Sequence, residues 1–242
     1  MPTLYADLHL HTVLSACAEV EMIPPLIVRR ALELGLNLLA VTDHNAAANC
    51  AGVIAAAAGT GLVILPGMEL TTAEDLHMLC LFETLEQALT WQGIVFDHLP
   101  DAPNNEDLFG AQYVVDGQGD YIRTEGRLLA ASTDLTLDEG VRRVTELGGL
   151  AIPAHIDRPM FSLFASLGFV PPGLPVPALE IFRRTDPAVL RQSHPEIAPY
   201  PLVRDSDAHQ LSEMRRGLAF EADAPAFESL AAVLSARSHH LL

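Results

Sequence analysis

The sequence is poor in cysteine, in basic residues and in long hydrophobic runs. Its three cysteines, Cys17, Cys50 and Cys80, are odd in number and show no Cys-x-x-Cys spacing, so we expect no disulfide scaffold and a reducing, cytoplasmic location. No apolar run reaches the about 18–20 residues that cross a bilayer. The start, Met1-Pro2-Thr3, lacks the regions of a signal peptide, and we expect no membrane partner.

Positive charge is scarce: 14 Lys and Arg stand against 31 Asp and Glu, which gives a net charge of −17. Such a surface repels polyanions, so we expect no broad nucleic-acid binding. A small phosphorylated substrate remains compatible with this charge where bound cations invert the local field.

The chain also lacks a glycine-rich phosphate loop and a Gly-x-Ser-x-Gly motif, which argues against a nucleoside triphosphatase and a serine hydrolase. Short apolar runs instead alternate with amphipathic segments. The expected strands are residues 4–11, 37–42, 62–65, 76–82, 150–154, 178–182 and 202–204. The expected helices are residues 25–34, 46–58, 85–98, 137–147, 161–167 and 224–235. This alternation predicts one α/β domain over residues 1–242, either a barrel or an open doubly wound sheet.

One polar segment interrupts the alternation. Residues 100–136 contain Pro103-Asn104-Asn105 and a predicted hairpin over residues 113–122. The segment is too short for a core of its own, so we interpret it as an insertion into the single domain.

Two histidines stand two residues apart on the first expected strand. Side chains at i and i+2 of a strand project from the same face, so His9 and His11 should point together. Neutral imidazole is the commonest protein ligand for borderline metals. The pair therefore predicts the beginning of a metal site.

Other ionisable residues lie at the ends of the expected strands. They are Asp43, His44, Glu69, His77, His155, Asp207 and His209. Because the carboxyl ends of parallel strands share one face, six histidines and two or three carboxylates should converge in one cup. Clustered carboxylates need compensating positive charge, which metal ions would supply.

These motifs, in this order, resemble the PHP (polymerase and histidinol phosphatase) family. The matching stretches are Asp7-Leu8-His9-Leu10-His11-Thr12, Thr42-Asp43-His44, Gly67-Met68-Glu69, His77, Ala154-His155 and Ser206-Asp207-Ala208-His209. The resemblance implies a distorted seven-stranded β/α barrel, similar to a TIM barrel, and a free-standing metal-dependent phosphoesterase. It implies three ions, held by His9, His11, Glu69 and Asp207, by Glu69, His77 and His155, and by Glu19, His44 and His209.

Position 19 departs from the family pattern, which more often has Asp there. Glu19 stands five residues before Pro24, and Glu21 is a competing candidate. The implied site therefore holds two or three divalent ions, the third depending on this carboxylate. Asp7 and Asp205 are candidates to orient the ligating imidazoles, although Asp205 could equally cap a turn.

Histidine-rich ligation suits Zn, Mn or Fe better than Mg or Ca. The expected reaction is hydrolysis of a phosphomonoester or small phosphodiester by metal-activated water held at Glu69 and Asp207. Arg158, Arg183 and Arg184 are candidates for binding the substrate phosphate, with a surface ion pair as the alternative for each.

Two other functions stay open. An amidohydrolase-like enzyme would attack a C–N bond and shares the His-x-His strand, but it usually has a lysine bridging the metals, and no lysine lies near a strand end. A non-catalytic, metal-binding regulatory domain is the second alternative. The full set of ligand-type residues favours an enzyme.

Overall fold

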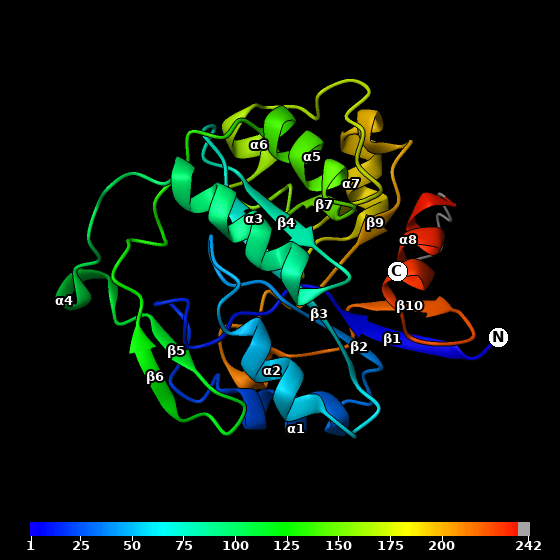
Figure 1. The fold of residues 1–242 in the computed structure, drawn as a ribbon. Coiled ribbons are helices and arrows are strands. Elements are labelled where there is room, and N and C mark those ends of the chain that lie inside the picture. The colour runs from blue at the N-terminus through cyan, green and yellow to red at the C-terminus, as the bar shows by residue number, and fades with distance from the viewer. Residues whose placement is uncertain (237–242) are drawn as a thin grey trace.

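The structure is a computed structural model that describes residues 1–236, and it shows a mixed α/β fold built on a curled, six-stranded half-barrel sheet (Figure 1). The order across the sheet is β10-β1-β2-β3-β4-β7. The bounds are β1 (Thr3–Asp7), β2 (Leu38–Val41), β3 (Val63–Thr71), β4 (His77–Leu81), β7 (Leu150–Pro153) and β10 (Leu218–Glu221). A separate parallel pair is formed by β8 (Leu179–Glu180) and β9 (Leu202–Val203). A strand thus overlaps every expected range, but β1 ends at Asp7, so His9 and His11 follow the first strand and do not lie on it. Strand β10 was not expected, and a single seven-stranded barrel sheet is not confirmed.

The separate pair joins the sheet at one rim. The Ile156 N–H, just beyond β7, donates to the Glu180 carbonyl at 2.9 Å, and the His11 N–H, beyond β1, donates to the Ala208 carbonyl at 3.0 Å. These hydrogen bonds bring the carboxyl ends of β1, β7, β8 and β9 to the same place.

The expectation of parallel strands is wrong for β4, which pairs antiparallel with both β3 and β7. The connection from β3 to β4 spans only residues 72–76, whereas a parallel crossover needs about a dozen residues or more. As a result β4 presents its amino end, His77, at the rim where its neighbours present their carboxyl ends.

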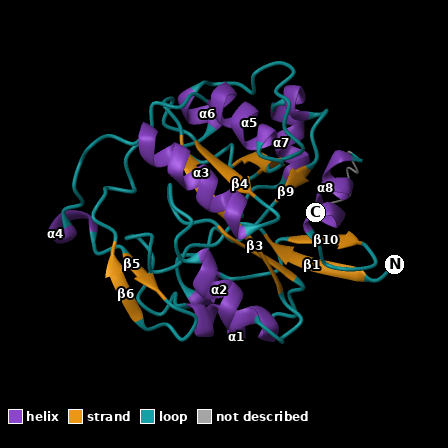
Figure 2. Cartoon of the chain, viewed as in Figure 1, coloured by secondary structure: helices purple, strands orange, loops and turns teal. Residues whose placement is uncertain are grey.

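Eight α-helices surround the sheet in the described part of the chain (Figure 2). They are α1 (Pro24–Glu33), α2 (Cys50–Ala57), α3 (Leu85–His98), α4 (Glu106–Phe109), α5 (Leu137–Glu146), α6 (Leu163–Ser166), α7 (Pro187–Ser193) and α8 (Phe227–Ser235). Two short 3-10 helices span Pro195–Ile197 and Leu211–Glu213. Local sequence sets several helix starts: Pro24 and Pro25 open α1, and Thr84 with Gln87 forms a capping box at α3. Across residues 1–236, no helix combines the length and apolarity of a membrane span.

The inner face of the sheet carries a core of its own. Leu65 of β3, Leu79 of β4 and Phe227 of α8 belong to it. Because strand side chains alternate between faces, Glu69 shares the face of Leu65 and His77 shares the face of Leu79. The predicted metal-binding residues Glu69 and His77 therefore lie on the same face of the sheet as this core.

The predicted hairpin is confirmed: β5 (Tyr113–Val115) pairs antiparallel with β6 (Tyr121–Thr124). Asn49 fastens it beside α2, since its side-chain amide donates to the Tyr113 carbonyl at 3.0 Å and its oxygen accepts from the Val115 N–H at 3.0 Å. Gly52 permits the close approach, because a Cβ there would lie 2.9 Å from the Val115 carbonyl oxygen.

Candidate metal centre

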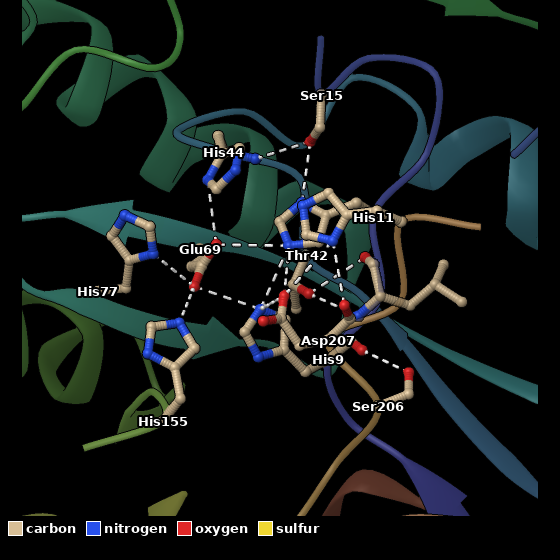
Figure 3. Close-up of polar contacts among 12 residues, drawn as sticks. His9, His11, Ser15, Thr42, His44, Glu69, His77, His155, Ser206 and Asp207 are labelled. Atoms are coloured by element: carbon tan, nitrogen blue, oxygen red, sulfur yellow. Dashed lines mark hydrogen bonds and ion pairs between the residues drawn. The ribbon is translucent and has the colours of Figure 1, made fainter. Parts of the chain in front are cut away.

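The carboxylate of Glu69 lies at the centre of five imidazole rings (Figure 3). The nearest nitrogens are His77 Nδ1 (2.8 Å), His155 Nε2 (3.0 Å), His44 Nδ1 (3.0 Å), His9 Nε2 (3.2 Å) and His11 Nε2 (3.4 Å). Glu69 is 1% exposed. The convergence predicted from the strand ends is therefore present.

We expected Glu69 to follow the end of its strand, but it lies within strand β3. Strand β3 runs on to Thr71, and Glu69 pairs with Leu79 of β4. Gly67 makes this possible, because a Cβ at that position would lie 2.6 Å from the Cys80 carbonyl oxygen. The close approach at Gly67 and the short connection to β4 thus allow β3 to continue beyond Pro66 as far as Thr71.

Asp207 lies beside His9 and His11, which follow β1 in the chain. Its Oδ1 is 3.5 Å from Nε2 of His9 and 3.5 Å from Nε2 of His11. Asp207 has a φ of 50° and His155 a φ of 28°, both in the left-handed region that non-glycine residues rarely adopt. Residues with such a strained backbone are common at functional sites, where the unusual conformation directs a side chain to a position that a regular strand could not reach.

The rings of His9 and His11 are oriented by partners on their far sides. His9 Nδ1 donates to the buried Glu180 carboxylate at 3.0 Å. His11 Nδ1 donates to the Ser15 hydroxyl at 3.0 Å, and that hydroxyl donates its own hydrogen to Asp43 at 2.7 Å. Each ring therefore carries a proton on Nδ1 and turns its Nε2 inward, and, despite burial, the neighbouring carboxylates of Glu180 and Glu69 raise the pKa of His9 well above its usual value.

This arrangement creates an electron-rich space. The two Nε2 atoms lie 3.3 Å apart, next to Glu69 Oε1 and Asp207 Oδ1. A metal ion bound there would displace any proton on these nitrogens and could take both Nε2 atoms and both oxygens as ligands. Three buried atoms of the cluster also have no hydrogen-bond partner: Glu69 Oε2, His155 Nδ1 and Asp207 Oδ1. These observations fit bound metal.

The described chain contains three groups of residues whose ligand atoms, within each group, all lie within 4.8 Å of one another. They are His9, His11 and Glu69, then His44, Glu69 and His77, and finally His11, His44 and His209. His209 Nδ1 donates to the Asp207 carbonyl at 3.0 Å, which leaves its Nε2 as the ligand atom. Imidazole and carboxylate donors in this proportion suit Zn, Mn or Fe.

The electrostatics of the cluster are dominated by its own members. Burial alone would raise the pKa of Glu69, but the charges of His77 and His9, together with the contacts of His155 and His44, hold it well below its usual range. Burial would lower the pKa of His44, yet contacts with Cys17 and Glu69 raise it to about 10. Burial would raise the pKa of the Cys17 thiol, and hydrogen bonds with His209 and His44 instead lower it to about 6.

Asp7 and Asp205 do not orient the imidazoles. Asp7 accepts the Ser206 N–H at 2.9 Å, and Asp205 accepts the Leu8 N–H at 2.8 Å. Each carboxylate thus joins the end of β1 to the segment after β9. Glu180 orients the His9 ring instead. This role was not predicted, because nothing in the stretch Leu179-Glu180-Ile181 distinguishes Glu180 from a solvent-facing strand residue.

Glu19 stands apart from the other predicted ligands. Its side chain is exposed and belongs to none of the three ligand groups found among residues 1–236. Only its main chain approaches the cluster, through an N–H that donates to the His209 carbonyl at 2.8 Å.

The three arginines differ in their surroundings. Arg158 donates to Asp207 Oδ2 at 2.9 Å and so lies at the cluster. Arg183 pairs with Glu213 at 2.8 Å, and Glu213 in turn accepts the His209 N–H at 3.1 Å. Arg184 is exposed.

A cavity of about 230 Å³ opens beside the cluster. His44, His77 and Cys17 line it, together with Phe161, whose ring stacks on His77 with centroids 4.9 Å apart. Phe109 and further residues of the segment 100–136 complete the lining. A larger cavity of about 590 Å³, between α5 and residues 171–175, is lined by none of the ligand groups and is remote from this chemistry.

The chain matches the PHP domain family over residues 7–149, which is more than half of its length, and it belongs to that family. No curated protein gives a significant match.

Solved structures share the fold at low sequence identity. Endonuclease Q from Pyrococcus furiosus has a TM-score of 0.69 and 19% identity, over 97% of this chain but 56% of its own. A predicted metal-dependent phosphoesterase from Bifidobacterium adolescentis has a TM-score of 0.56 and 20% identity, over 94% and 92% of the two chains. An amidohydrolase from Chromobacterium violaceum has a TM-score of 0.58 and 17% identity, over 95% and 96%. At such identities these similarities establish the fold alone.

Proposed function

We propose that this protein hydrolyses phosphate esters, a phosphomonoester or a small phosphodiester, with two or three divalent transition-metal ions held around Glu69. Membership of the PHP family supports a metal-dependent hydrolase. The observation that carries the proposal is the close approach of four electron-rich atoms, the Nε2 atoms of His9 and His11 with oxygens of Glu69 and Asp207, at 3.2–3.5 Å. Zn, Mn and Fe are the ions that suit this donor set.

The roles of the residues follow from their contacts. When bound, the ions would supply activated water and polarise the phosphate oxygens. Glu69 would be shared between two ions, because its two oxygens face different histidines: Oε1 faces His9, His77 and His155, and Oε2 faces His11 and His44.

Arg158 is our candidate for the phosphate-binding group. It contacts Asp207 through one nitrogen only, and its side chain is 29% exposed, so further guanidinium N–H groups can reach a substrate oxygen. Arg183 instead supports the main chain of His209 through Glu213, and Arg184 lies exposed on the surface. We expect neither of these two to grip the phosphate as strongly as Arg158.

The amidohydrolase-like alternative shares the fold with one of the solved structures. Its usual bridging lysine has no counterpart, since all 14 basic residues of this chain are arginines. Phosphate-ester hydrolysis is therefore favoured over attack on a C–N bond.

The expectation of no broad nucleic-acid binding is not supported by the likeness to endonuclease Q, one structure of which holds a duplex with an abasic lesion. The substrate panel must therefore include nucleic acid. The acidic surface still favours short substrates over long duplexes.

The test is turnover by the purified chain with defined added Zn, Mn or Fe, against phosphomonoesters, small phosphodiesters, oligonucleotides and an amide panel. Metal analysis of the same preparation should find at least two ions per chain. Glu69→Gln should lose both the ions and the turnover. A protein that binds no metal, or that cleaves only amides, contradicts the proposal.

A further inference from the structure

Cys17 is the one cysteine of the chain that is exposed, whereas Cys50 and Cys80 are buried, and all three are free thiols. Its thiol lies in hydrogen-bonding contact with the imidazoles of His44 and His209. It also lines the cavity beside the cluster. Nothing in the predicted ligand set made use of this side chain.

The loop that carries Cys17 is fastened on both sides. Before it, Asp43 accepts the Thr12 N–H and the Ser15 hydroxyl, each at 2.7 Å. After it, the Glu19 N–H donates to the His209 carbonyl at 2.8 Å. Main-chain hydrogen bonds therefore hold residue 17 next to His209, and they do not depend on the side chain at position 19.

A second observation points to a ligand at this side of the cluster. The ligand atoms of His11, His44 and His209 lie within 4.8 Å of one another, and Cys17 lies outside this group while contacting two of its members, His44 and His209. Oε2 of Glu69, 1% exposed, faces this group at 3.0 Å from His44 Nδ1 and 3.4 Å from His11 Nε2, yet has no hydrogen bond of acceptable geometry. Burying a carboxylate oxygen without a hydrogen bond costs free energy, and a cation bound between this oxygen and the imidazoles would offset that cost.

We propose that the Cys17 thiolate, with His44 and His209, holds the third metal ion, in the place that family resemblance gives to the carboxylate of Glu19. This inference rests on the proposed metal-dependent hydrolase. A thiolate is a softer ligand than a carboxylate, so the third position selects Zn or Fe over Mn or Mg. The two remaining positions keep the imidazole and carboxylate ligands already described.

The first experiment loads the chelator-treated full chain with Co²⁺. Thiolate ligation produces a charge-transfer absorption in the near ultraviolet that imidazole and carboxylate ligation do not. We expect this band in the wild type and in Glu19→Gln and Glu21→Gln, and its loss in Cys17→Ser together with one ion per chain. Cys17→Asp should recover the ion without the band. A band that survives in Cys17→Ser overturns the proposal.

The second experiment needs no variant. Iodoacetamide should alkylate Cys17 in the metal-free protein and spare it in the zinc-loaded protein, with the buried Cys50 and Cys80 as unreactive internal controls. If the protein binds two ions but Cys17 reacts equally in both states and gives no cobalt band, this inference fails while the proposed function stands. If the protein binds no metal at all, the proposed function fails as well.

Discussion

Glu180 accepts a hydrogen bond from Nδ1 of His9 at 3.0 Å, with both side chains buried and their positions 171 apart in the chain. The same carboxylate accepts the main-chain N–H of His155 at 2.9 Å. One side chain of β8 thus fixes the ring of a predicted ligand after β1 and the backbone of another after β7.

Replacing this carboxylate should weaken the metal centre without unfolding the protein. Glu180→Gln removes the charge that holds the His9 proton on Nδ1, so we expect zinc affinity to fall by roughly 10–100-fold. Competition titration with a chelating dye measures the change. Glu221→Gln, an exposed carboxylate on β10, is the matched control and should leave affinity unaltered. Equal affinities for wild type and Glu180→Gln would remove the orienting role.

Metal affinity should increase with pH. In the metal-free protein the pKa of His44 is raised to about 10, because its contacts with Cys17 and Glu69 outweigh burial, so this imidazole is protonated at neutral pH. Metal binding must displace that proton, and affinity should therefore rise by about tenfold per pH unit below the raised pKa. Proton release on adding zinc in weakly buffered solution measures this directly. Binding with no proton release at pH 7 would contradict the prediction.

The segment 100–136 should influence substrate choice. Phe109 of α4 lines the cavity beside His44 and His77, whereas its neighbour Leu108 is 71% exposed and does not. We expect Phe109→Ala to alter the relative rates among phosphate esters while the metal content stays constant. Leu108→Ala is the control on the same helix. Unchanged relative rates in Phe109→Ala would assign this segment to packing instead.

Gly67 should be required for stability as well as for placing Glu69. An added Cβ would lie 2.6 Å from the Cys80 carbonyl oxygen, so Gly67→Ala should lower the free energy of unfolding by about 1–3 kcal/mol. Gly93→Ala, in the exposed interior of α3 with no atom near the added Cβ, should raise it by about 0.5–1 kcal/mol. Urea denaturation of both variants provides the measurement. A Gly67→Ala protein as stable as wild type would show that β3 and β4 can separate without cost.

The sequence predicted the elements that local chemistry controls. Pro24-Pro25 and the following Gly35 bounded the first helix because proline suits the first turn and Gly35 adopts a φ of 67°. The convergence of His9 and His11 was predicted from strand periodicity, and their Nε2 atoms lie 3.3 Å apart, although both residues follow the end of β1 at Asp7. The direction of β4 could also have been predicted, since residues 72–76 are too few for a parallel crossover.

The sequence by itself thus determined the type of fold and which histidines and carboxylates gather at one rim, because strand order and strand ends are local patterns repeated along the chain. Only the tertiary structure decided the contacts between distant segments. Glu180 beside His9, and Cys17 instead of Glu19 beside His209, depend on how β8 and the loop after β1 pack against the cluster. The left-handed turn at Asp207 is likewise imposed by its surroundings, since an isolated aspartate has no preference strong enough to fix it.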